Sequence, residues 1–189
     1  RSRNNGIEWE RISTTFLSQD VDAIAIDSSG NLYAGTEGGF IYKSTNQGDS
    51  WTLEITGFSA SSIVRFITVA NDSSIFASAR YDGIFHSSNG GHSWVKITDN
   101  LPANVYFDVA INNKNELFVS LYEAGIYYSN DLGNSWINIT DNLPKTRIQN
   151  IIFDKEGYIY IGTEESAFKS KDTVVTGFSV KEFDELPLS

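Results

Sequence analysis

The eight residues SSNGGHSW, at positions 87–94, decide the fold because the same pattern recurs along the chain. It returns as STNQGDSW at 44–51 and as SNDLGNSW at 129–136, so that the closing tryptophans lie 43 and 42 residues apart. A fourth copy, SRNNGIEW at 2–9, keeps this register but has Glu8 where the others have serine. We call these four segments the octapeptides. A fixed period of this length indicates repeated structural units packed side by side.

The rest of each unit repeats as well. An apolar stretch such as DAIAID (22–27) is followed by a polar turn, a second stretch such as LYAGT (32–36) and a third such as FIYKS (40–44). Residues after the octapeptide, such as WTLEI (51–55), alternate with the period of a strand. The sequence therefore predicts an all-β fold of β-propeller blades, each with four antiparallel strands. A helical solenoid is excluded because no segment has apolar residues at helical spacing.

The octapeptides resemble the Asp-box, or BNR repeat, of sialidases, xyloglucan hydrolases, sortilin-type receptors and photosystem-assembly factors. This resemblance covers residues 2 to about 170. Residues 30–44 and 157–170 also resemble the propeller repeats in sensor regions of two-component regulators. Both resemblances imply a β-propeller and leave the ligand open.

Turn chemistry explains most of the octapeptide. An Asn or Asp at its third position can accept bonds from backbone N–H groups, and the glycine can take a positive φ at little cost. The tryptophan is expected to fill the seam between neighbouring blades. We therefore interpret these positions as fold determinants rather than as calcium or sugar ligands: Asn46, Gly48, Trp51, Asn89, Gly91, Trp94, Asp131, Gly133 and Trp136.

The predicted units are residues 14–55, 56–98 and 99–140 as blades, and 141–170 as three strands of a last blade. Residues 1–13 form an octapeptide with one outer strand, and 171–189 form a degenerate octapeptide and a linker. The N-terminal strand could close a four-bladed ring by joining the last blade, or two chains could combine. We favour a third interpretation, a partial propeller that lacks upstream blades.

Composition excludes several functions. The net charge of -10 argues against nucleic acid and anionic lipid as partners, and no apolar run is long enough for membrane insertion. With no cysteine and two histidines, no metal site or cofactor is predicted. The tail 174–189 resembles the linker before the secretion sorting domain of Bacteroidetes-like propeller proteins, which implies a secreted, cell-surface or periplasmic bacterial protein.

One face of the blades is the expected ligand face, because turns between second and third strands share it with the connections between blades. The residues predicted to bind a ligand are Arg80, Tyr81, Asp82, Tyr122, Glu123 and Glu164. Further polar residues of this face are Glu37, Asp99, Asn100, Asp141, Asn142, Lys145, Arg147 and Glu165. A sialidase-like site would need three arginines to clamp the substrate carboxylate, and the candidates are Arg80, Arg65 and Arg147. The stretch VRFITV around Arg65 lacks the proline of the sialidase motif, so the match is weak.

The first functional hypothesis is a non-catalytic binding or scaffold module for a glycan or protein ligand, because architecture explains every strong motif. The second is a fragment of a sialidase-like or xyloglucanase-like glycoside hydrolase, for which Glu123 with Glu164 or Asp82 could supply a carboxylate pair. The third is the periplasmic sensor propeller of a two-component regulator.

Overall fold

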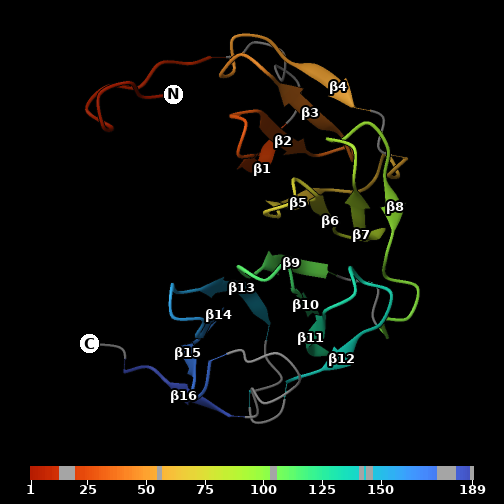
Figure 1. The fold of residues 1–189 in the computed structure, drawn as a ribbon, viewed down its shortest axis with the longest axis vertical. Coiled ribbons are helices and arrows are strands. Elements are labelled where there is room, and N and C mark those ends of the chain that lie inside the picture. The colour runs from red at the N-terminus through yellow and green to blue at the C-terminus, as the bar shows by residue number, and fades with distance from the viewer. Residues whose placement is uncertain are drawn as a thin grey trace.

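The computed structural model describes residues 1–12, 20–54, 57–102, 106–140, 143, 147–173 and 182–187, with the side chains of 106 and 107 left undescribed. These residues form four antiparallel sheets of four strands, each in sequential order (Figure 1). The prediction of an all-β fold made of four-stranded blades is confirmed. No helix among the described residues is long and apolar enough to cross a membrane.

Each blade runs from a long inner strand to a short outer strand. Blade 1 contains β1 (Val21–Ile26), β2 (Leu32–Thr36), β3 (Ile41–Ser44) and β4 (Thr52–Glu54). Blade 2 contains β5 (Val64–Val69), β6 (Ile75–Ala79), β7 (Gly83–Ser87) and β8 (Val95–Lys96). Blade 3 contains β9 (Tyr106–Ile111), β10 (Leu117–Leu121), β11 (Gly125–Ser129) and β12 (Ile137–Asn138). Blade 4 contains β13 (Ile148–Phe153), β14 (Ile159–Thr163), β15 (Ala167–Ser170) and β16 (Phe183–Glu185).

The blades follow one another along an open arc, with β1, β5, β9 and β13 on its concave side (Figure 1). Three apolar clusters fill the three seams between neighbouring blades. In the first seam, Ala23 and Tyr33 of blade 1 meet Ile67 and Ile75 of blade 2. Because the side chains of a strand alternate between its two faces, the sheets of blades 2 and 3 pack one face on the preceding blade and the other on the next.

The octapeptides form self-bonded turns. In the copy at 87–94, the Ser87 hydroxyl accepts the Gly91 N–H at 3.0 Å, and Asn89 Oδ1 accepts the Ser93 N–H at 3.0 Å. The Trp94 indole donates to the Gly91 carbonyl at 2.9 Å. The copy at 44–51 repeats these contacts. Trp94 packs into the seam between blades 1 and 2.

The third octapeptide departs from this pattern in two ways. Its indole, from Trp136, reaches the Ile97 carbonyl of blade 2 at 3.0 Å. Asp131 replaces asparagine and accepts the Ser135 hydroxyl at 2.6 Å, a hydrogen bond that lowers the pKa of Asp131. Gly133 has a φ of 88°, and its Cα faces Ile97 so closely that a Cβ atom would meet Ile97 Cδ1 at 2.7 Å. The third octapeptide therefore also fastens blade 3 to blade 2.

The ends of the chain differ from the expected arrangement. Residues 183–185 were expected within a linker, but they pair with β15 as the fourth strand of blade 4, with Ser170 opposite Phe183. Phe183 is buried in the cluster of blades 3 and 4. Because β16 occupies this edge, the idea that the N-terminal strand closes the ring on the last blade is wrong. Residues 1–12 contain no strand and extend beyond blade 1 (Figure 1).

Candidate functional site

The turns between second and third strands place one side chain of each blade at an equivalent position. These side chains differ from blade to blade: they are Glu37, Arg80, Tyr122 and Glu164. In blade 2 the Arg80 N–H donates to the Ile63 carbonyl at 2.9 Å, which ties the turn to the beginning of β5. In blade 3 the turn has the same length, with Leu121 opposite Gly125 as Ala79 is opposite Gly83 in blade 2, and Glu123 has a φ of 54°. The repeat thus places an acid, a base, an aromatic ring and a second acid at the same position of successive turns.

Arg80, Tyr81 and Asp82 do not act as a single group. The Arg80 guanidinium lies 5.1 Å from the centroid of the Tyr81 ring, and that ring is 53% exposed. Asp82 has a structural role instead. Its Oδ2 accepts the Ser59 N–H at 2.6 Å and so fixes the connection that enters blade 2. Arg80 and Tyr81 therefore remain the candidate ligand contacts of this turn.

A second cluster joins blades 3 and 4. Arg147 donates to Glu164 Oε1 at 2.9 Å and also lies 5.6 Å from the centroid of the Tyr122 ring. Tyr122 is 40% exposed. This cluster unites two residues that the sequence predicted as ligand contacts, Tyr122 and Glu164, through an arginine from the blade connection. It gives the face a second aromatic ring with a cation beside it.

Two arginines of blade 2 have unused donors. Arg65 lies at the beginning of β5, where the pairing register with β6 shifts between Val64 and Phe66. The Nε atoms of Arg65 and Arg80 are both buried and lack a hydrogen-bond partner among the described residues. Within those residues neither arginine forms an ion pair. A buried N–H without a partner is costly.

Other residues of the expected face have different outcomes. The Asn100 amide donates at 3.5 Å to the Asn134 carbonyl, within the octapeptide of blade 3. Asp141, Asn142 and Lys145 lie outside the described residues.

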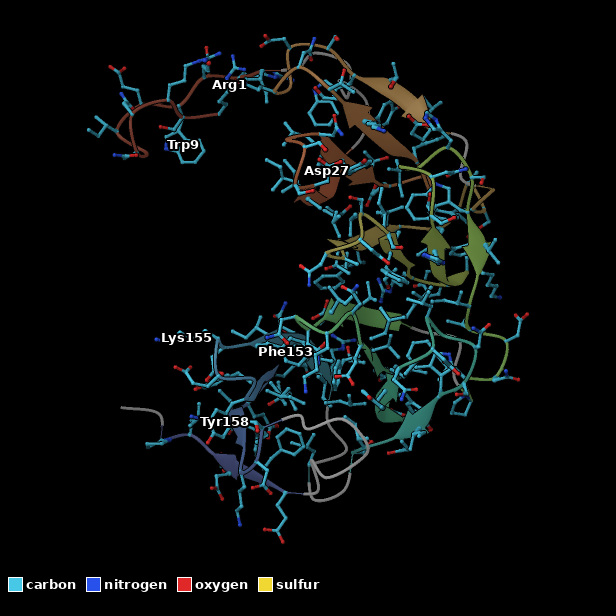
Figure 2. All side chains as sticks on the ribbon, in the orientation of Figure 1. Arg1, Trp9, Asp27, Phe153, Lys155 and Tyr158 are labelled. Atoms are coloured by element: carbon cyan, nitrogen blue, oxygen red, sulfur yellow. The ribbon has the colours of Figure 1, made fainter. Side chains whose placement is uncertain are left out.

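At the opposite end of blades 3 and 4, a groove of about 410 Å³ lies between the β9–β10 and β13–β14 turns. Phe153 and Lys155 line this groove and are labelled in Figure 2.

Asp108 is a buried acid that the sequence analysis did not single out. It lies on β9, is 5% exposed, and its Oδ2 accepts the Ile151 N–H of β13 at 2.6 Å. Burial raises its pKa to about 6, against the lowering effect of the Ile151 and Val109 N–H groups. Its signal in the sequence is weak, since the equivalent positions hold Ala23, Phe66 and Asn150. Asp108 fastens the inner strands of blades 3 and 4.

Residues 1–121 match the DUF6242 beta propeller domain. The chain belongs to the DUF6242 beta propeller domain family. Residues 142–165, in blade 4 and the connection before it, match the two component regulator propeller. No curated protein matches this DUF6242 propeller.

Solved structures share its fold at low identity. The GH74 xyloglucanase from Xanthomonas campestris superposes with a TM-score of 0.70 at 16% identity, over 87% of this chain and 30% of the xyloglucanase. YCF48 from Cyanidioschyzon merolae gives 0.71 at 15% identity, over 96% of this chain and 60% of YCF48. A catalytically inactive virginiamycin B lyase from Staphylococcus aureus, solved with quinupristin, superposes with a TM-score of 0.72 at 11% identity. The superposition covers 95% of this chain and 59% of the lyase. The DUF6242 propeller thus spans less than two thirds of each of these chains.

The described residues of the DUF6242 propeller contain no group of three His, Asp or Glu side chains placed to hold a metal ion. The turn face offers two exposed aromatic rings, three arginines, and two carboxylates that are already engaged, those of Asp82 and Glu164. Such a set can stack on a flat ligand surface and donate hydrogen bonds to acceptors.

Proposed function

We propose that this DUF6242 propeller is a non-catalytic binding or scaffold module whose ligand docks on the face of the second-to-third-strand turns. One observation carries the proposal: Tyr81 and Tyr122 are exposed on neighbouring blades, and each has an arginine beside its ring. Exposed rings held by a rigid sheet contribute contact area with little loss of side-chain entropy. The octapeptides, in our interpretation Asp-box turns, supply the rigid frame.

A glycan is the ligand class that this chemistry favours over a protein segment. The face of a tyrosine ring packs against the C–H face of a sugar, and arginine N–H groups bind hydroxyl or carboxylate oxygens. The positive charge of Arg80 beside the Tyr81 ring adds a preference for an acidic group. A protein ligand would contact the same two rings, and it would be recognised in the binding experiment below by binding to peptides instead of glycans.

The state of the carboxylates supports a non-catalytic role. Glycoside hydrolysis uses two carboxyl groups across a groove, one of them with a raised pKa. On the turn face Asp82 is held by Ser59 and Glu164 by Arg147. Among the described aspartates and glutamates, the one with a raised pKa is Asp108, which lies in a seam between blades.

Two other functions have specific support. Likeness to the GH74 xyloglucanase from Xanthomonas campestris and to a GH74 enzyme from Niastella koreensis keeps a glycoside hydrolase fragment as the second candidate. The match of residues 142–165 to the two component regulator propeller supports a sensor propeller as the third. For the first and third candidates the protein would act outside the cytoplasm, and cell fractionation with protease treatment of intact cells would test that location.

The binding test compares wild type with Tyr81→Ala and Tyr122→Ala on arrays of neutral glycans, acidic glycans and peptides, followed by calorimetry on any hit. Each variant should weaken binding about tenfold, or about 1.4 kcal/mol. Val95→Ala is the control, because Val95 is also an exposed apolar side chain, at 66%, but lies on outer strand β8. Full affinity in both tyrosine variants would rule out this face as the site.

The catalytic test incubates wild type with xyloglucan and with acidic oligosaccharides and measures new reducing ends. We expect none above a heat-treated control. Reducing ends that disappear in Glu164→Gln or Glu123→Gln would replace the binding proposal with the hydrolase.

A further inference from the structure

The face of blade 1 that looks away from blade 2 is apolar and uncovered. At equivalent positions of the later inner strands, Ile67, Val109 and Ile151 are 9%, 3% and 3% exposed, because each packs on the preceding blade. Ile24, at the same position of β1, is 67% exposed, and Ile26 is 64% exposed. This face of β1 therefore has the composition of a seam without its partner blade.

Residues 1–12 contain a complete octapeptide that belongs to no described sheet. The Ser2 hydroxyl accepts the Gly6 N–H at 2.8 Å, Asn4 Oδ1 accepts the Glu8 N–H at 2.9 Å, and the Trp9 indole donates to the Gly6 carbonyl at 3.0 Å. These are the bonds of the octapeptides that follow β3 and β7. In contrast to those copies, the Trp9 side chain is 76% exposed.

The N-terminal segment contacts blade 1 as the outer strand of a preceding blade would. In the arc, the third residue after each tryptophan covers the octapeptide glycine of the next blade: Glu54 lies against Gly91, and Ile97 against Gly133. Ile12, the third residue after Trp9, covers Gly48 in the same way. Arg1 adds an ion pair to Asp49 at 2.9 Å.

Figure 2 shows Arg1 near blade 1 and Trp9 farther out, beside the open side of the arc. The octapeptide and the residues after it are thus placed as in the later blades, although residues 1–12 form no strand. No described residues correspond to the three inner strands that would join this segment to the Ile24 face.

We infer that the face formed by Ile24 and Ile26 binds three further strands of the same repeat, supplied by the same polypeptide ahead of Arg1, and that residues 1–12 complete their blade. The occupant is a three-stranded sheet with apolar side chains toward β1 and toward Trp9. A second copy of this chain fits less well, because its blade 4 already has β16 as fourth strand, where residues 1–12 would have to lie. The repeat makes such a blade complementary to β1 without any new contact type.

The experiment extends the chain with the sequence that naturally precedes Arg1, about 30 residues, which is one blade less its outer strand. Trp9 is the reporter: we compare acrylamide quenching of each protein with that of its Trp9→Phe variant. In the extended protein the Trp9 signal should move to shorter wavelength and lose most of its quenching. Ile24→Asp should lower the urea midpoint of the extended protein and leave that of the 189-residue chain nearly unchanged.

A second extension guards against a poorly folding natural segment. It places a copy of residues 57–85, the first three strands of blade 2, directly before Arg1, so that Ser2 takes the place of Ser87. Burial of Trp9 in either extended protein supports the inference. Trp9 that stays fully quenchable in both, or a 189-residue chain that forms a dimer in light scattering and loses it with Ile24→Asp, overturns it.

Discussion

Replacing Asp108 with asparagine should remove a defined part of the pH dependence of stability. Asp108 is buried between blades 3 and 4, and burial raises its pKa from 3.8 to about 6. The folded protein therefore binds more protons than the unfolded chain between these values. The stabilising contribution of this proton is fully present below about pH 4 and is lost as pH rises through about 6.

The magnitude follows from the linkage relation. A shift of about two units corresponds to about 3 kcal/mol over the whole range, and to about 1.4 kcal/mol between pH 7.5 and pH 5.0. The lower limit stays above the isoelectric point of about 4.6, where the protein has no net charge to oppose association. Asparagine keeps the size of the side chain and an oxygen that can accept the Ile151 N–H.

The assay is urea unfolding followed by tryptophan fluorescence at a series of pH values. From pH 7.5 to pH 5.0, the free energy of unfolding of wild type should rise by about 1.4 kcal/mol relative to Asp108→Asn. Asp22→Asn is the control for the loss of one carboxylate, since Asp22 is exposed on inner strand β1. Parallel profiles for wild type and Asp108→Asn would refute the reasoning.

Three further substitutions test the octapeptides by urea unfolding. Trp94→Ala should lower the free energy of unfolding by about 3 kcal/mol because its ring fills a seam, whereas Trp9→Ala should cost less than about 0.5 kcal/mol; equal costs would contradict our account of the seams. Gly133→Ala should cost about 2 kcal/mol, since φ is 88° and the new Cβ would press on Ile97. Asp131→Ala should cost about 1 to 2 kcal/mol through its lost hydrogen bonds, and an unchanged midpoint would show that this turn does not need its acceptor.

The fold could be predicted from the sequence because period and turn chemistry agree within every unit. The strand β16 could not, because residues 170–176 lack the glycine and tryptophan that mark the other octapeptides. Without that glycine and tryptophan, the sequence pattern of the acidic tail is typical of a linker. Its role depends on Phe183 reaching the apolar seam of blades 3 and 4, a long-range contact that no local pattern contains.

The candidate site was harder to predict because polar side chains have several possible partners. Asp82 looked like a ligand contact, but the Ser59 N–H uses its carboxylate, and the path of the connection that brings Ser59 close is not visible in the sequence. Asp108 looked like an ordinary strand residue until its burial was known. Arg147 could be placed on the turn face, but its contacts with Tyr122 and Glu164 required coordinates.

The repeat itself separates positions that hold the fold from positions free to recognise a ligand. The octapeptide contacts occur in nearly the same form at 2–9, 44–51, 87–94 and 129–136, so a change in any copy alters a turn or a seam. In the second-to-third-strand turns, four successive blades instead present Glu, Arg, Tyr and Glu directly after the second strand. Because neither the turn nor the seam requires a particular side chain there, chemistry at that position can vary without loss of the fold. That freedom, together with the arginines beside Tyr81 and Tyr122, is why we place recognition on this face and stability in the octapeptides.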